Sequence, residues 1–522
     1  MTHVGHSPSE RDPFEGEHNP FAAPEQTAAT HQVDSDEEVT GRDHGCLPDW
    51  QTGDLPEPLP LTVKNIFRTI GPGAILLAAS IGGGEWIVGP MAAVKYGTEI
   101  LWIATAGIFL QLIFNLEAIR YTLYSGEPIV TGIMRLNPGS RFWGMFYIVM
   151  GVIQLVAPAL ALGCANVLFA AAAGREPVKA DSTTLLWISF VVVAVAVVML
   201  LSGKSVEKVL ERLSWGMIIF IFCFLITANV LFVPLEIWQR TALGFLIPHG
   251  LPAEADFMLL AAFASTAGSG GLGNLAISNL CRDKGLGMGA WMGSFGGIMA
   301  DENSRLATIG RVFLPTADNL RRWAIWWKYS LLDQSVLWAM GCVLGMFLNV
   351  NLTLAIVPPG TALEGYAAGA FQARHMAEQL WHGFWVLALI NGFWILFSTQ
   401  LGNADCLARI VADVAWSGWP RLHRMSASRL YARLLLGFSA MGIVVLSLGD
   451  NALSLFKILG VFAGPILAVG AFQILRVNTR FLPKEVRPPM WRRVALIGCG
   501  LFYGLITITL IVKQLTGLFV TA

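Results

Sequence analysis

The sequence predicts an all-α, polytopic membrane protein with about eleven transmembrane helices. Three observations lead to this fold class. The 522-residue chain is 55% hydrophobic and 13% charged, whereas soluble domains carry about 25% charged residues. Hydropathy then separates about eleven apolar segments, each long enough to cross a hydrocarbon core of about 30 Å. Finally, clusters of glycine interrupt the first and the sixth of these segments near their middles.

The predicted spans divide into two five-helix halves and one extra helix. Repeat one covers about 66–234, repeat two about 256–475, and the extra helix about 490–516. Residues 1–60 are polar, acidic and dotted with proline, and we expect them to form a disordered cytoplasmic tail before a transmembrane domain at 61–522. The mixed segment 402–429 is expected to lie at the membrane interface. The expected spans are 66–94, 99–124, 142–173, 184–203, 213–234, 256–281, 327–350, 379–401, 430–449, 452–475 and 490–516.

The first break is the run Gly82-Gly83-Gly84-Glu85. Each glycine costs about 1 kcal/mol against alanine within a helix, and a carboxylate inside a membrane span is costly as well. The run begins about 18 Å into its segment, close to the bilayer midplane. A helix broken at this depth must face protein or water, because lipid cannot satisfy the freed backbone groups. The alternative is a kinked helix whose glycines allow close helix packing.

The second break is the run from Gly268 to Gly273, which interrupts the apolar segment at about 257–280. Paired broken helices in corresponding halves indicate the substrate site of a secondary transporter. We therefore expect a midplane site around which one bundle rocks against the other. The half-helix ends at such a site offer N–H groups to anions and carbonyl groups to cations.

The distribution of positive charge predicts the orientation. Most of the 35 Lys and Arg residues fall in alternate loops, starting with the N-terminal tail, and positive loops remain in the cytoplasm. The N-terminus is thus expected inside and the C-terminus outside, in the plasma membrane. Spans 1 and 6 then run in opposite directions, which makes the two halves inverted repeats.

Composition and motifs exclude several functions. The net charge of zero gives no argument for nucleic-acid binding. The chain has neither a nucleotide-binding P-loop nor a dinucleotide fingerprint, so we expect no ATP-driven pump, no enzyme and no cofactor. None of the seven cysteines forms a closely spaced pair, which favours small core residues over disulfides or a zinc site. The oligomeric state stays open.

Several stretches resemble the Nramp (natural resistance-associated macrophage protein) family of metal-ion transporters. The opening Gly71-Pro72-Gly73 and the break up to Trp86 are similar to the family's Gly-Pro-Gly opening and its Asp-Pro-Gly-Asn-Trp break. The second break, which ends in Asn274-Leu275, resembles the family's Met-Pro-His-Asn-Leu break. The resemblance covers about residues 65–500. Further matching stretches are Lys95-Tyr96-Gly97, Leu101-Trp102, Glu207 to Leu213, Ser398 to Pro420 and the region of Pro465.

The resemblance implies the inverted-repeat fold of leucine transporters and proton-coupled secondary transport of a metal cation. Matched by position, the family's metal-binding Asp and Asn correspond to Gly82 and Glu85. Its sulfur-bearing Met corresponds to Gly271, and a glutamine of span 10 that approaches the ion corresponds to Lys457. Because the thioether and the aspartate are missing, the resemblance implies a site for a hard cation and poor binding of manganese or cadmium.

The predicted substrate site contains seven residues. Glu85, the one candidate metal ligand, could bind a hard cation or carry the coupling proton. Lys457 could line the pocket and pair with Glu85, or it could snorkel to the external face. Ser269 and Asn274 could be neutral ligands or caps of the second half-helix. The seven substrate-binding candidates are Gly82, Gly83, Glu85, Ser269, Gly271, Asn274 and Lys457.

Intramembrane polar side chains are candidates for ion coupling. They are Glu85, Glu117, Asp333 and Asn391, although each could instead be structural or hydrated. The leading functional hypothesis is a transporter of a small inorganic cation, with protons as the coupled ion. The alternatives are a transporter of a small organic solute, such as an amino acid or amine, and a membrane sensor that does not transport.

Overall fold

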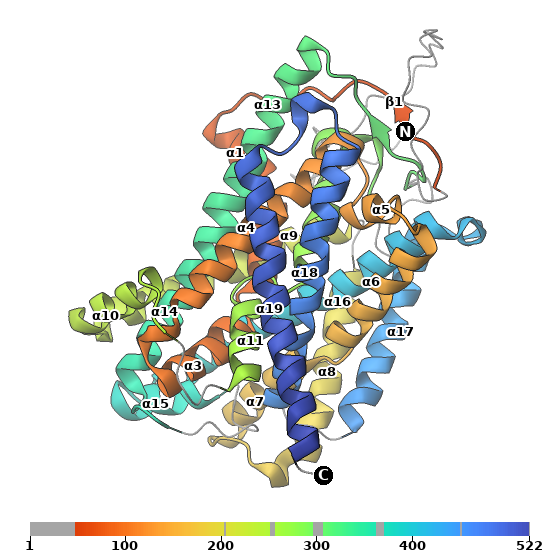
Figure 1. Ribbon diagram of the computed structural model, residues 1–522. Helices are drawn as coiled ribbons and strands as arrows, with labels where there is room; N and C mark the ends of the chain where they lie inside the picture. Colours follow the sequence, from red (N-terminus) through yellow and green to blue (C-terminus); the bar gives the residue numbers. More distant parts are fainter. Residues whose placement is uncertain are drawn as a thin grey trace, which may run out of the picture.

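The structure, a computed structural model, describes residues 47–202, 205–250, 256–295, 306–361, 370–448 and 452–520. Long helices run side by side along one axis of the molecule (Figure 1). Within the described ranges, ten helices are long and apolar enough to cross a membrane, and the broken sixth span completes the eleven that hydropathy predicts. The predicted fold class is confirmed: an all-α polytopic membrane protein built from two inverted five-helix repeats with discontinuous spans 1 and 6.

The helices of the two repeats follow the chain in order. Repeat one contains α2 (Pro72–Ser80), η1 (Gly84–Val88) and α3 (Gly89–Tyr96) as span 1, then η2 (Thr98–Ile100) with α4 (Trp102–Ser125), α6 (Ser140–Leu155) with α7 (Ala159–Ala173), α8 (Ser182–Leu201) and α9 (Val206–Phe232). Repeat two contains α11 (Phe257–Thr266) and α12 (Leu272–Lys284) as span 6, then α13 (Ala317–Leu331), η5 (Leu332–Ala339) and α14 (Met340–Ile356) as span 7, α16 (Phe384–Gly418), α17 (Ala427–Ser447) and α18 (Ala452–Arg480). The extra span is α19 (Met490–Val520).

Short elements connect these spans. Two β-strands, β1 and β2, pair in parallel, with Gln51 opposite Arg311 and Thr52 opposite Val312. The connecting helices are α1 (Val63–Thr69), α5 (Ile129–Met134), η3 (Lys179–Asp181), α10 (Leu235–Leu246), η4 (Gly287–Trp291), α15 (Phe371–Gln379), η6 (Pro420–Arg424) and η7 (Lys484–Val486).

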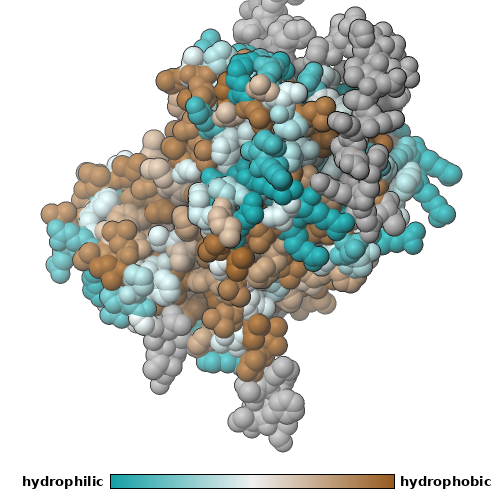
Figure 2. Space-filling view, turned by 45° about the horizontal axis from the view of Figure 1, so that its top comes forward, coloured by the Kyte–Doolittle hydropathy of each residue, from teal (hydrophilic) through white to brown (hydrophobic). Residues whose placement is uncertain are grey.

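The two broken spans occupy the centre of the bundle. In span 1, 89% of the most apolar stretch of residues is buried inside the protein, compared with 28% in α17 and in α19. The half-helix α12 packs on α2, and α11 packs on η1 and α3, so the two breaks lie next to each other. Hydrophilic side chains gather at the end of the molecule that carries β1, whereas hydrophobic side chains dominate the flanks (Figure 2). The centre of the bundle is thus shielded from lipid by the other spans.

Residues 47–60 differ from the disordered tail that we expected up to residue 60. Leu47 and Leu55 are buried. The backbone N–H of Leu55 donates to Asn319 Oδ1 at 3.1 Å, and the Arg322 guanidinium donates to the Leu55 carbonyl at 2.7 Å. This strap therefore packs along α13, because it has apolar side chains to bury and strand partners in β2. Residues 1–46 lie outside the described part of the chain.

The segment 402–429 is also different from the interfacial extension that we expected. The helix α16 continues without a break to Gly418. Asp405, Arg409 and Asp413 on its last turns are buried, and they form ion pairs with each other and with α12. The charges that suggested an interface are therefore paired inside the bundle.

The orientation across the membrane can be tested with single cysteines. Arg321 on α13 and Arg175, two residues after α7, have side chains that are 57% and 52% exposed. The helices α13 and α7 lie near opposite ends of the bundle (Figure 1). In intact cells, an impermeant thiol reagent should label Arg175→Cys and should reach Arg321→Cys only after permeabilisation. Labelling of both from one side would contradict the topology, and the reverse pattern would contradict the orientation.

Candidate functional site

The first break separates α2 from the π-helical turn η1. The chain leaves helical hydrogen bonding after Ser80 and resumes it at Gly84. Glycine is required here by close neighbours, since a Cβ on Gly82 would lie 2.1 Å from Thr399 Oγ1. A Cβ on Gly84 would lie 2.2 Å from the carbonyl oxygen of Thr266. The glycines thus let span 1 approach α16 and α11 closely.

The second break separates α11 from α12, and its backbone needs glycine for a different reason. Gly270 and Gly271 have φ angles of +64° and +75°, in the left-handed region that side chains with a Cβ rarely adopt. Asn274 caps the half-helix that follows, because its Oδ1 accepts the N–H of Gly271 at 3.0 Å. Asn274 therefore serves as the expected cap, and Gly271 provides the turn.

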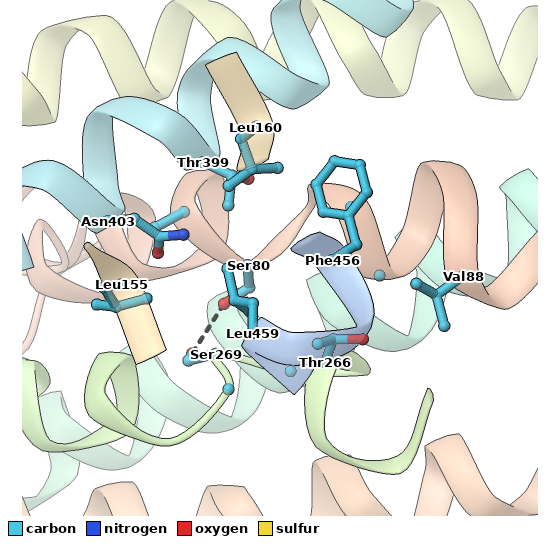
Figure 3. Close-up of a pocket in the computed structure, with 15 residues that line it drawn as sticks. Ser80, Val88, Leu155, Leu160, Thr266, Ser269, Thr399, Asn403, Phe456 and Leu459 are labelled. Atoms are coloured by element: carbon cyan, nitrogen blue, oxygen red, sulfur yellow. Dashed lines mark hydrogen bonds between the residues drawn. The ribbon is translucent and has the colours of Figure 1, made fainter. Parts of the chain in front are cut away.

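A small cavity lies between the two breaks. The hydroxyls of Ser80 and Ser269, one from each broken span, meet in it at 2.8 Å (Figure 3). Its volume for water-sized spheres is about 40 Å³, enough for about three water molecules. Neutral side chains and exposed backbone line it: Ala79, Ser80, Gly83, Gly84, Val88, Leu155, Leu160, Thr266, Gly268, Ser269, Gly270, Thr399, Asn403, Phe456 and Leu459.

Side chains from neighbouring helices satisfy the backbone groups that the breaks leave free. On α4, Gln111 accepts the N–H of Ser269 at 2.9 Å and donates to the Ser265 carbonyl at 3.2 Å. On α6, Gln154 donates to the Gly270 carbonyl and accepts the N–H of Leu272. Sequence reasoning missed both glutamines. Their signal was a carboxamide in the middle of an otherwise apolar span, where polar residues are costly and therefore informative.

Glu85 is fully buried behind the cavity and does not line it. Its Oε2 accepts the N–H of Gly82 at 3.0 Å, while Oε1 has no hydrogen-bond partner among the described residues. From α14, the Cys342 thiol lies within electrostatic reach of this carboxylate, and the Met346 sulfur packs against Gly89. Sequence reasoning found no sulfur in either break, and span 7 brings two sulfur atoms close to the first.

The predicted pairing of Lys457 with Glu85 is wrong in this structure. Lys457 Nζ lies 3.2 Å from Oδ2 of Asp256, with side chains 24% and 31% exposed. Asp256 caps α11 through its other oxygen, which accepts the N–H of Leu259. The helical period explains the difference, because Phe456 and Leu459 face the cavity and Lys457 therefore points to another side of α18. Lys457 therefore joins the first turns of α18 to the start of α11 instead of lining the site.

The comparisons with known proteins concern the fold of the chain. The chain superposes on structures of the manganese transporter of Eremococcus coleocola with a TM-score of 0.64 and 14% identity, covering 90% of this chain and 91% of that one. The chain has an Nramp-like fold. It also superposes on MhsT in complex with L-phenylalanine, with a TM-score of 0.51 and 14% identity over 84% of this chain and 97% of that chain. The fold of this chain is thus similar both to that of the manganese transporter and to that of MhsT.

Comparison of the sequence alone reveals fewer similar proteins than comparison of the structure. No family model matches the chain. An uncharacterised protein of Pasteurella multocida (strain Pm70) is 26% identical over 197 residues, which cover 35% of this chain. The match spans 43% of that protein's own length. The similarity to solved structures therefore shows the fold, whereas the evidence for the site comes from the residues of this chain.

The structure separates the predicted site residues into different places. Of the seven substrate candidates, Gly83 and Ser269 line the cavity. Among the coupling candidates, Glu117 forms ion pairs with Arg120 and Arg492 near the β1 end of the bundle. Asn391 on α16 is buried, and neither its oxygen nor its nitrogen has a hydrogen-bond partner among the described residues. Asp333 belongs to a polar chain that starts at the second break.

The close approach at the first break predicts a steric effect. Gly84→Ala should lower the free energy of unfolding by about 1–3 kcal/mol, since the added methyl group meets the backbone of Thr266. The measurement is the thermal melt of the purified protein. As a matched control, Gly216 on α9 has no heavy atom within 4 Å of its Cβ position. Gly216→Ala should leave the melt unchanged or raise it, and equal effects of the two changes would contradict the packing argument.

The ion pair of Lys457 predicts which double-mutant cycle shows coupling. Lys457→Met and Asp256→Asn should couple by about 0.2–1 kcal/mol in stability, as expected for a partly exposed pair. Lys457→Met and Glu85→Gln should be additive within about 0.5 kcal/mol. Thermal melts of the single and double variants provide both cycles. Coupling of Lys457 to Glu85 instead would restore the pairing that sequence reasoning suggested.

Proposed function

We propose that this protein is a secondary transporter of a small, hard cation, which binds in the cavity between the two breaks. The observation that carries the proposal is the meeting of the Ser80 and Ser269 hydroxyls at 2.8 Å in that cavity. One hydroxyl comes from each inverted repeat. A bound ion would thus contact both halves, as alternating access around a midplane site requires.

The donor atoms and the size of the cavity support a hard cation. Oxygen atoms of hydroxyl, carboxamide and carbonyl groups line it, and such ligands suit hard cations. About three water positions leave room for an ion with part of its hydration shell. Glu85 lies one residue beyond Gly84 and would add negative charge behind the site without filling it.

The composition of the site argues against a typical transition-metal centre. In the described ranges, no three His, Cys, Asp or Glu side chains come together in a way that could hold a metal ion. The sulfur atoms of Cys342 and Met346 are near the first break, but neither residue lines the cavity. The likeness to a manganese transporter supports a metal cation as the class, while the cavity itself favours harder ions.

A small organic solute is the second candidate, and two observations favour it. The cavity lining carries no net charge, and the fold resembles that of MhsT in complex with L-phenylalanine. In the present conformation, however, the cavity volume of about 40 Å³ is too small for an aromatic amino acid. A small organic solute is therefore the second candidate substrate, after a cation.

We also propose that transport is coupled to protons and that the protein resides in the plasma membrane with its N-terminus inside.

Uptake into proteoliposomes tests the proposal. Magnesium, calcium, manganese, cadmium and a mixture of amino acids should be offered separately and in competition. We expect saturable uptake of a hard cation, and Ser80→Ala or Ser269→Ala should weaken its apparent affinity about tenfold or more, as for a lost contact to a charged ligand. Ser189→Ala is the control, because its hydroxyl donates only to Leu185 on the same peripheral helix.

Other outcomes would overturn this ranking. Uptake of an amino acid that no cation inhibits would favour the second candidate. Tight, saturable transport of cadmium would contradict the preference for hard ions. Absence of any flux from a folded protein would favour a sensor, the third class that the sequence left open.

A further inference from the structure

A one-way chain of hydrogen bonds joins the two broken spans outside the cavity. It begins at the second break, where the N–H of Gly271 donates to Asn274 Oδ1 at 3.0 Å. Asn274 Nδ2 then donates to Asn115 Oδ1 on α4 at 2.9 Å. Asn115 Nδ2 donates to Gln334 Oε1 on η5 at 3.1 Å, and Gln334 Nε2 donates to Asp333 Oδ2 at 2.8 Å.

The chain ends at the start of span 1. Oδ1 of Asp333 accepts the N–H of Gly73 at 3.0 Å, and Gly73 is the second residue of α2. No side chain within α2 caps this helix. Asp333 therefore supplies the cap from span 7, and a carboxylate at a helix N-terminus is favourable. Contact is close, since a Cβ on Gly73 would lie 2.6 Å from the carbonyl oxygen of Asp333.

The backbone fixes the direction of this chain. The N–H of Gly271 can only donate, so Asn274 must turn its oxygen toward it and its nitrogen toward Asn115. By the same reasoning, Asn115 and then Gln334 each accept at the oxygen and donate from the nitrogen, so the last donor of the chain faces Asp333. At the other end the N–H of Gly73 can only donate as well. Asp333 must therefore accept at both oxygens, which suits a carboxylate, whereas a carboxylic acid keeps one good acceptor and gains a donor at its other oxygen.

Protonation of Asp333 would weaken a bond at one of the two half-helices. A proton on Oδ1 would make this oxygen a poorer acceptor for the N–H of Gly73 and loosen the cap of α2, which is lost when the proton points at that N–H. A proton on Oδ2 would weaken the bond from Gln334 in the same way, unless the three carboxamides all reverse. In that case the nitrogen of Asn274 would face the N–H of Gly271, and the cap of α12 would be lost. Each buried donor left without a partner costs about 1–3 kcal/mol.

We propose that Asp333 is a proton-binding site that links protonation to release of a half-helix beside the cavity. Asp333 is 2% exposed, and the three carboxamides in the chain are fully buried, so water does not replace the lost partner. The proposal gives the coupling proton of the proposed transporter a place separate from the cation cavity. The inference rests on the proposed function only where it assigns this proton to transport. The proton site itself is inferred from the hydrogen bonds around Asp333.

Charged and titratable groups face Asp333 from two neighbouring helices. Lys284 and Cys281 on α12 and Glu211 on α9 interact with it electrostatically. Its two printed hydrogen-bond donors, the Gly73 backbone on α2 and the Gln334 carboxamide on η5, are uncharged. Lys284 pairs with Glu211 at 2.6 Å, and both side chains are partly exposed, 14% and 17%. A Cβ on Gly71 would lie 2.7 Å from the Glu211 carboxylate, so this pair gives protons an entry close to the start of α2.

The test measures access to the cavity and needs no transported substrate. Leu459, which lines the cavity, is changed to cysteine after Cys46→Ser and Cys223→Ser, and its labelling rate by a maleimide is followed from acidic to alkaline pH. Asp333→Asn keeps an oxygen for Gly73 but turns a donor toward Gln334, as the protonated acid does. Beyond the intrinsic pH response of the thiol, the wild-type rate should change about fivefold or more. Asp333→Asn should remain at its acidic value throughout.

Two further variants sharpen the result. Asp318→Asn changes a carboxylate on α13 whose side chain is 52% exposed, and it should keep the wild-type profile. Gln334→Leu removes one donor to the carboxylate, which favours the protonated form. Its midpoint should therefore move to higher pH, and this variant decides the question if Asp333→Asn does not fold.

The outcomes separate this inference from the proposed function. A profile of Asp333→Asn equal to that of the wild type, or an unchanged midpoint in Gln334→Leu, would overturn the proton site. Cation uptake combined with such a result would leave the proposed function intact. A pH-dependent step that requires Asp333, in a protein without cation uptake, would support the proton site and contradict the cation proposal.

Discussion

The structure depends on one constraint: two helices are broken in the middle of a membrane bundle, and their freed backbone groups must find partners. Water is scarce there, and an unsatisfied buried peptide group costs several kcal/mol. The partners come from other helices, with Gln111 on α4, Gln154 on α6 and Thr399 on α16. Glu85 and Asn274 add local caps. These polar side chains thus stabilise the two breaks, and other polar groups at the breaks line the cavity.

The same constraint explains how much of the fold and the site could be predicted from the sequence. Spans and breaks are local signals, since hydropathy and the glycine runs at 82–84 and 268–273 lie within single segments. Partnerships depend on the fold. Lys457 looked like a partner for Glu85 because both were matched to the same site, but the turn of α18 takes it to Asp256. Similarly, no pattern within α4 announces that Asn115 bridges Asn274 and Gln334.

Burial also changes how charged residues should be interpreted. The charges after residue 402 suggested an interface, yet Arg409 is fully buried and pairs with Asp283 and Asp405. Phe295 packs its ring against the guanidinium groups of Arg282 and Arg409. Because several partners share each charge, the cluster removes its charges from water without leaving any of them isolated. A sequence can show that such charges are present, but only the fold shows that they neutralise one another.

These ion pairs are unevenly distributed along the bundle, and the difference has a mechanical consequence. The end near β1 contains the buried pairs of Glu117 with Arg492, Glu127 with Arg135 and Arg282 with Asp413. At the other end, the pair of Lys457 with Asp256 is partly exposed. Separating one partner from a buried pair costs about 3–5 kcal/mol, whereas an exposed pair contributes about 0.2–1 kcal/mol. Breaking the ion pair between α11 and α18 is therefore far less costly than breaking the pairs at the β1 end, where protonation of Asp333 would instead act on the hydrogen bonds that hold α2.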